Sequence, residues 1–220
     1  MPGREWCAAT CSADCYASIR WSRYRRRPDR RGERRIPCAA LVLRCTAKAL
    51  NLLGARPKTW LPREHSDEDW YANLLWLERQ KCMLLAHAGT LFSVFVPGVH
   101  KADLVPIGAS VVALIHNELR AESLPLNRFG VLDPGSVELA KTSSRTVLGY
   151  MNEMARFCEY AVAESGGLAR SDVQELNREL RRQLHLSRQP PGYFVPIELA
   201  QRSSTRDTAV ERQHHLRIVD

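Results

Sequence analysis

The sequence has no long hydrophobic run: no apolar stretch approaches the roughly 20 residues that a membrane-spanning helix needs. It also lacks a secretory h-region, a phosphate-binding loop, a dinucleotide fingerprint, a zinc-ligand pair and a nucleophile elbow. We therefore expect a soluble, cytoplasmic protein without a membrane partner, and no pattern identifies a familiar enzyme. With 220 residues, 45% of them hydrophobic, the chain is long enough to bury a proper core.

Cysteine is present in an odd number, seven, and without a secretory context, which predicts reduced thiols. Cys7, Cys11 and Cys15 are spaced four apart, but no fourth ligand or matching histidine accompanies them. We therefore predict no metal site and no cofactor. Three other cysteines lie within apolar patterns and are expected as small core residues: Cys45, Cys82 and Cys158.

Positive charge is concentrated in residues 1–37, which hold ten arginines against four acids and so supply six of the net charge of +8. Such an Arg-rich block is expected to be disordered and self-repelling. It is either a basic arm that binds nucleic acid or upstream sequence translated from a misassigned start, with the natural protein beginning near Leu41 or Val42. The second interpretation is favoured, because the first strand pattern begins only at Ala39. Residues 38–200 are then a single domain, followed by a loose tail over 201–220.

The densest run of strand-forming residues lies between Trp70 and Gly98. Three apolar runs of strand length are separated by short polar breaks, which predicts an antiparallel three-stranded meander. A helical interpretation fits the first run alone, and the short spacing of the breaks argues against it. Gly89 is expected to take the positive φ of the second turn.

The flanking segments predict two more strands and several helices. The strands are expected at Ala39–Cys45 and Ser136–Ala140, which completes an α+β fold with a mainly antiparallel sheet of about five strands and three main helices packed on it. A short helix, 47–53, should begin after Thr46 and end at Gly54. Longer helices are predicted from Asp103 to about Glu122, from Ser144 to about Glu164, and after a Ser171/Gln174 capping box with Val173, Leu176, Leu180 and Leu184 facing inward.

The best candidate site lies where the strand ending near Ala140 meets the helix that begins at Ser144. The free N–H groups at a helix N-terminus suit an anion, and hydroxyl and basic side chains cluster there. We predict an anion-binding site made by Lys141, Thr142, Ser144, Arg145 and Asn152. The alternative is that Ser144 is only an N-cap and that Arg145 pairs with a carboxylate.

His87 and Arg79 are possible accessory residues. A histidine in a hairpin turn can act as a general base or a ligand, but it can equally be a turn residue bonded to the backbone. Arg79 either continues a basic edge or keeps the hairpin soluble.

Six short segments occur in a recognisable order along the chain: Leu43–Lys48, Trp70–Leu75, Arg79–Cys82, Thr90–Ser93, Pro97–Val99 and Arg145–Asn152. This ordered set resembles an uncharacterised bacterial family, a domain of unknown function sometimes found in plasmid-type open reading frames. The resemblance covers about residues 41–200, supports the misassigned start, and implies a fold but no chemistry.

These observations favour a non-catalytic binding module for an anionic ligand, either nucleic acid or a phosphate-bearing molecule. Two alternatives remain: a hydrolase-type enzyme that uses His87, Arg145 and Asn152, and a protein-interaction module of a mobile-element system.

Overall fold

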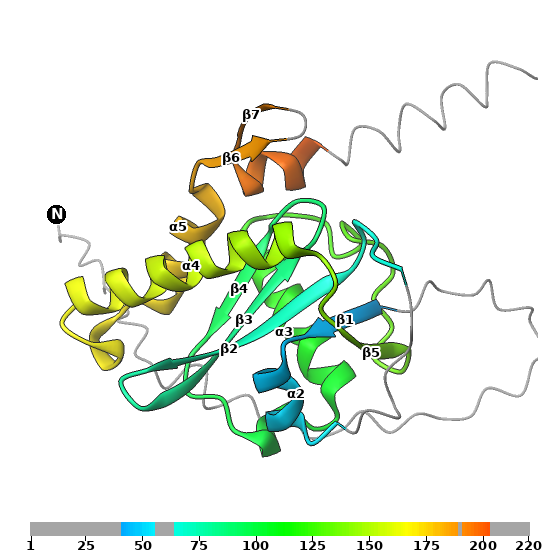
Figure 1. Ribbon diagram of the computed structural model, residues 1–220, viewed down its shortest axis with the longest axis horizontal. Helices are drawn as coiled ribbons and strands as arrows, with labels where there is room; N and C mark the ends of the chain where they lie inside the picture. Colours follow the sequence, from blue (N-terminus) through cyan, green and yellow to red (C-terminus); the bar gives the residue numbers. More distant parts are fainter. Residues whose placement is uncertain (1–40, 56–63, 189–190, 203–220) are drawn as a thin grey trace, which may run out of the picture. The chain divides into compact units, whose positions relative to one another are not determined.

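The computed structural model describes residues 41–55, 64–188 and 191–202, which form an α+β domain (Figure 1). Five strands make a mixed sheet in the order β4-β3-β2-β1-β5, and β6 and β7 form a separate two-stranded sheet. The predicted fold class is confirmed. The expected extension over 1–37 and the tail after 202 lie outside the described residues. The elements are β1 (Leu41–Cys45), α2 (Ala47–Leu53), β2 (Trp70–Leu77), β3 (Gln80–His87), β4 (Ser93–Val96), α3 (Ile107–Ala121), β5 (Val137–Lys141), α4 (Arg145–Glu164), α5 (Val173–Arg182), β6 (His185–Arg188), β7 (Pro191–Phe194) and helical residues 196–202.

The predicted meander is present as β2, β3 and β4, which pair antiparallel. Glu78 and Arg79 form the first turn with φ of 48° and 66°, as in a type I′ hairpin. The expectation that Gly89 takes positive φ in the second turn is wrong, because Leu91 does so instead (φ 57°). Gly89 is required by a close approach: a Cβ there would lie 2.9 Å from the carbonyl oxygen of Asp67.

β1 lies inside the sheet and pairs parallel with both β2 and β5. Two of the four ladders of this sheet are therefore parallel, which adds a feature that local sequence patterns did not reveal. Parallel strands need a crossover connection, and α2 supplies one between β1 and β2. As predicted, the Thr46 side chain caps α2 by accepting a hydrogen bond from the Ala49 amide, and Gly54 ends it with φ of 66°.

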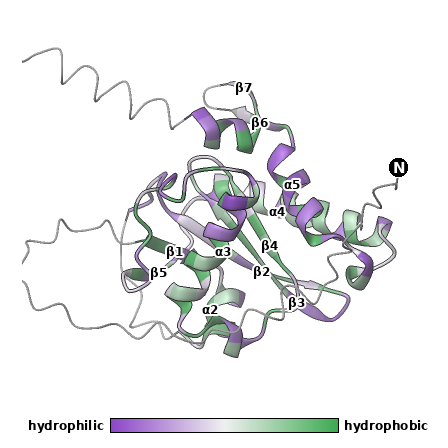
Figure 2. Ribbon diagram, turned by 180° about the vertical axis from the view of Figure 1, so that it is seen from behind, coloured by the Kyte–Doolittle hydropathy of each residue, from purple (hydrophilic) through white to green (hydrophobic). Residues whose placement is uncertain are grey.

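Helices cover both faces of the sheet (Figure 1). Side chains alternate between the two faces along each strand, and consecutive buried residues in β3 and β4 show that both faces are covered. Leu43 and Trp70 face a core that includes Leu50 of α2 and Ile115 of α3. α4 contacts the sheet at β2 and β3, and α5 contacts it at β4. Figure 2 shows the central strands as mainly hydrophobic, whereas α5 is mainly hydrophilic because only one face of it is buried. No helix of the described residues is long and apolar enough to cross a membrane.

Two predicted helix starts are displaced. His100, not Asp103, is the N-cap of a short 3-10 helix, Lys101–Leu104, in which the Asp103 carboxylate accepts a hydrogen bond from the His100 amide (2.9 Å), and α3 begins only after Pro106. Proline disfavours helical backbone in the residue before it, and Val105 is accordingly extended. The third predicted helix is capped by Asp172 rather than by Ser171, and because this helix ends at Arg182, Leu184 is exposed instead of buried.

The outer edge of β4 is sealed by side chains of α5 instead of by another strand. Asn177 accepts a hydrogen bond from the Phe95 amide (2.6 Å) and donates one to the Phe95 carbonyl oxygen (2.9 Å). Arg181, with 1% of its surface exposed, donates to the Ser93 carbonyl oxygen (3.0 Å). Satisfying the backbone groups of an edge strand in this way prevents edge-to-edge association.

Arg181 also forms buried ion pairs with α3. Its guanidinium donates to Glu118 Oε2 at 2.8 Å and to Oε1 of the residue after α3, Glu122, at 2.9 Å. Arg181 lies on the helix of one sheet face and its acidic partners belong to the helix of the other. This cluster therefore links the two helical layers around the β4 edge.

Replacing Arg181 is expected to destabilise the domain strongly. In Arg181→Met, Glu118 loses this partner while staying buried, which should lower the free energy of unfolding by about 3–5 kcal/mol in urea denaturation. The matched control is Arg178→Met, which removes an exposed ion pair with Glu175 and should cost at most about 1 kcal/mol. Equal losses in the two variants would contradict the assigned role.

Candidate functional site

A cavity of ≈ 660 Å³, here called the α4 pocket, lies where the start of α4 meets residues 64–69, the β3–β4 turn and the β6–β7 hairpin. Its volume is typical of small-molecule sites, which lie mostly between about 300 and 1,000 Å³. It therefore is the best candidate site of the described residues. The lining residues are His65, Asp67, Ala88, Gly89, Leu91, Ser144, Thr146, Val147, Tyr150, Ser187, Pro191, Gly192, Tyr193, Phe194 and Leu199.

The start of α4 presents backbone donors to this pocket. Ser144 is the N-cap, as predicted, and its Oγ accepts a hydrogen bond from the Val147 amide (3.3 Å). Within the described residues, the amides of Arg145 and Thr146 have no hydrogen-bond acceptor. The first N–H groups of a helix are left without intrahelical partners, and the helix dipole adds partial positive charge there.

The hydroxyl group of Tyr71 fixes the position of the α4 start. Tyr71 is fully buried, and its oxygen accepts a hydrogen bond from the Ser144 amide at 3.1 Å. The same oxygen lies 3.1 Å from His65 Nδ1 and 3.4 Å from Ser143 Oγ. One phenol thus holds residues 64–69 and the α4 N-terminus together beside the pocket.

A buried guanidinium, that of Arg44, supports this arrangement from β1. Arg44 Nε donates to Asp69 Oδ2 at 2.5 Å, and Nη1 donates to the Lys141 carbonyl oxygen at 3.2 Å. Nη2 donates to the carbonyl oxygen of Glu64. Arg44 therefore ties both ends of residues 64–69 and the end of β5 to one strand, and its charge balances that of Asp69.

Of the predicted anion-binding residues, Ser144 alone lines the α4 pocket. Lys141 is exposed at the end of β5, and Thr142 is half-buried. Arg145 and Asn152 are exposed and share a face of α4, as expected from their spacing, but the pocket faces the side that carries Thr146 and Tyr150. The pocket thus lies beside the predicted helix start, but four of the five predicted side chains are not part of its lining.

The two predicted accessory residues lie at opposite ends of the β2–β3 hairpin. Arg79 is exposed in the turn, whereas His87 pairs with Trp70 at the other end of the strands. The strand between them, Gln80–His87, is about 23 Å long at 3.3 Å per residue. No hydrogen bond or ion pair between described residues joins His87 to Arg145 or Asn152.

His87 has the surroundings of a core histidine. It is 4% exposed, its Nδ1 lies 3.1 Å from Thr90 Oγ1, and its ring lies 4.3 Å from that of Phe129 between centroids. Burial lowers the pKa of His87 to about 3, with a further contribution from the nearby charge of Arg128. The imidazole is consequently neutral at neutral pH.

Residues that local patterns missed make most of the pocket. His65 lies in a segment that reads only as a polar loop, and it reaches the site because Tyr71 and Arg44 hold that segment there. Tyr193 and Phe194 belong to a Pro/Gly-containing stretch that was expected only to be extended. Nothing in the local sequence indicates that this stretch pairs with β6 and faces the start of α4.

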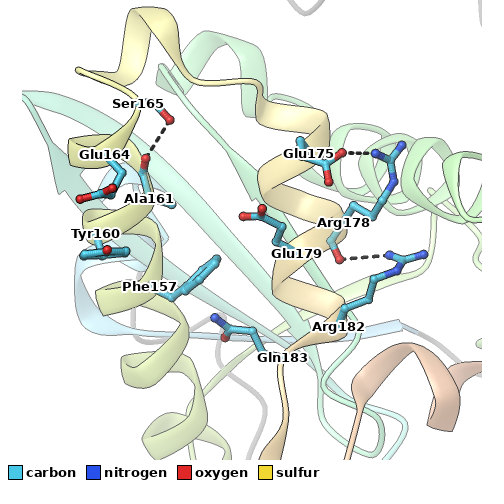
Figure 3. Close-up of a pocket in the computed structure, with 10 residues that line it drawn as sticks. All are labelled: Phe157, Tyr160, Ala161, Glu164, Ser165, Glu175, Arg178, Glu179, Arg182 and Gln183. Carbon is cyan, nitrogen blue, oxygen red and sulfur yellow. Dashed lines mark hydrogen bonds and ion pairs between the residues drawn. The ribbon is translucent and has the colours of Figure 1, made fainter.

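A second cavity, of ≈ 620 Å³, lies between α4 and α5 (Figure 3). Phe157 points between the two helices, and Glu179 extends toward α4. The arginines are already used: Arg178 pairs with Glu175, and Arg182 pairs with Glu122. This groove is therefore a weaker candidate for an anion-binding site than the α4 pocket is.

The part of the chain that the structure describes shows neither a metal-binding cluster nor a reactive thiol among Cys45 and Cys158. No group of three or more His, Cys, Asp or Glu residues there could hold a metal ion. Burial raises the pKa of the Cys45 and Cys158 thiols to about 12, so both are protonated core residues, as predicted. The spaced cysteines Cys7 to Cys15 lie outside the described residues.

The chain belongs to the family described as "Domain of unknown function (DUF6933)", whose family model matches residues 42–199. This confirms the resemblance to a family without an assigned activity and places the match on the described domain. No curated protein matches the chain. The family thus supplies no chemistry, and function has to be argued from the site.

Removing the Tyr71 hydroxyl is expected to destabilise the domain. Tyr71→Phe keeps the buried ring but leaves the Ser144 amide without its acceptor, which should lower the free energy of unfolding by about 1–2 kcal/mol in urea denaturation. Tyr160→Phe is the matched control, because Tyr160 is 63% exposed and should lose almost nothing. An unchanged Tyr71→Phe variant would show that the phenol does not hold the α4 start.

The neutral His87 should make stability fall in acid. Its pKa is about 3 when folded and 6.5 ordinarily, so below pH 6.5 the unfolded chain binds a proton that the folded chain does not. Between those two pKa values, each unit by which the pH falls should therefore lower the free energy of unfolding by about 1.4 kcal/mol. His87→Phe keeps a ring but cannot titrate. Between pH 7 and pH 5, it should lose about 2 kcal/mol less than the parent protein, and equal losses would refute the assignment.

Proposed function

We propose that the protein is a non-catalytic binding module whose α4 pocket takes a small anionic molecule bearing a phosphate or carboxylate group. The observation that carries this proposal is the pocket at the start of α4, where the amides of Arg145 and Thr146 have no acceptor among the described residues. An anion at a helix N-terminus accepts hydrogen bonds from such amides and interacts favourably with the helix dipole.

The side chains near these amides are suited to an anion. The hydroxyl-bearing residues Ser144, Thr146 and Ser187 line the pocket, and so does the imidazole-bearing His65, whose Nδ1 lies 3.1 Å from the Tyr71 oxygen that the Ser144 amide also contacts. Asp67 is the one carboxylate among the lining residues; its side chain is 85% exposed and lies 3.9 Å from His65 Nε2. Water therefore screens most of the repulsion that Asp67 would exert.

A small molecule fits this site better than a nucleic acid does. The site is a concave pocket of ≈ 660 Å³ rather than an extended basic surface. Most of the net positive charge belongs to residues 1–37, which are outside the described residues. The bacterial origin, plasmid context and cytoplasmic location expected from the sequence stay predictions.

The hydrolase alternative has weaker support. A general base needs a pKa near the working pH and reach to the reacting group. His87 is 4% exposed and has a pKa of about 3, and it makes no described contact with Arg145 or Asn152. The protein-interaction alternative would use the α4–α5 groove, whose exposed Tyr160 and half-buried Phe157 are the features that favour it.

A charge placed at the pocket tests the proposal. In ¹⁵N NMR titrations with inorganic phosphate, the amide signals of Arg145 and Thr146 should shift saturably. Thr146→Glu places a carboxylate beside these amides and should weaken binding at least about tenfold. Glutamate is tolerated in the first turn of a helix, so the fold should persist.

Thr146→Gln is the matched control, because it has the same size and shape as Thr146→Glu but no charge. It should retain phosphate binding within about threefold. Phosphate that leaves the α4 signals unchanged, or two variants that bind equally, would overturn the proposal.

A further inference from the structure

We infer that the ligand of the α4 pocket contains a planar ring attached to its anionic group, and that this ring stacks on Tyr193. This inference rests on the proposed function and specifies its ligand class. The additional observation behind it is the β6–β7 hairpin, whose Tyr193 and Phe194 line the pocket together with the start of α4.

Tyr193 is an exposed aromatic side chain at the edge of a cavity. It is 72% exposed, yet it lines the pocket together with Phe194 and Pro191. Among the described residues it has no hydrogen bond and no ring contact. Its ring therefore has no described ring partner within the protein that a stacked ligand would have to displace.

The hairpin that carries Tyr193 is held in place by other side chains. His185 is 3% exposed and stacks on Phe194, with ring centroids 5.6 Å apart and planes at 30°. Tyr150 meets both rings edge-on, at 5.4 Å and 5.7 Å, and its hydroxyl donates to the Leu186 carbonyl oxygen at 2.8 Å. Two-stranded hairpins alone are marginally stable, so these contacts position the wall before a ligand binds.

A ring is the chemical group that this wall fits. Flat π faces are complementary to planar ligands, and stacking on an aromatic side chain strengthens binding by about tenfold or more. The polar residues Ser144, Thr146 and His65 line the same pocket and would contact the charged end. A planar aromatic phosphate or carboxylate satisfies both parts.

Three phosphate probes separate charge from ring. Inorganic phosphate, cyclohexyl phosphate and phenyl phosphate should be titrated into the full-length protein, with dissociation constants measured by NMR. Phenyl phosphate should bind about tenfold tighter than cyclohexyl phosphate, which has a similar size but no flat face. Equal affinities for these two probes would overturn the inference while leaving the proposed function intact.

Variants of Tyr193 assign the effect to one side chain. Tyr193→Leu should remove the preference for phenyl phosphate over cyclohexyl phosphate, whereas Tyr193→Phe should retain it. Tyr160→Leu is the matched control, because Tyr160 is similarly exposed (63%) and lines the other groove. A preference that survives Tyr193→Leu would overturn the inference. If none of the probes shifts the α4 signals, the proposed function fails and the inference fails with it.

Discussion

The buried guanidinium of Arg181 connects elements that the chain order keeps apart. It lies on α5, reaches around the open edge of β4, and meets Glu118 of α3 on the other side of the sheet. An arginine can do this because its planar group offers five donors, so one side chain serves both a strand edge and two carboxylates. Cation–π contact with Phe92, at 5.0 Å, adds to its fixation.

A second buried arginine, on the inner strand β1, also connects segments that are far apart in the chain. Arg44 joins β1 to the end of β5 and to residues 64–69, and the Tyr71 hydroxyl then connects that segment to the start of α4. The candidate site is thus built on two buried polar groups that are fully used in structural contacts. What remains for a ligand are the groups in front of them: backbone amides, hydroxyls and aromatic faces.

The histidines support the proposed binding role. His65 lines the α4 pocket, is partly exposed and lies 3.1 Å from a phenol oxygen, whereas His87 is neutral, enclosed and outside the pocket lining. An anionic ligand with an aromatic body would use the two sides of the α4 pocket at once. The family has no assigned activity, so it neither supports nor contradicts this proposal.

Local sequence determined the elements of this protein. Apolar runs of strand length, separated by short polar breaks, predicted β2, β3 and β4. Thr46, Gly54 and Ser144 set helix ends through hydrogen bonds that span at most four residues. The anion site at the start of α4 stays a prediction, which came from the hydroxyl and basic residues clustered at a predicted helix N-terminus.

Tertiary structure alone decided which elements meet. Parallel pairing of β1 with β5, about 95 residues apart, leaves no local pattern, since both strands are short apolar runs like any others. The positions of His65 and Tyr193 likewise leave no local pattern. His65 reaches the pocket through the contacts of Tyr71 and Arg44, and Tyr193 reaches it on a hairpin that His185 helps to hold. Only the folded chain brings these groups together, because each contact is set by packing rather than by neighbouring residues.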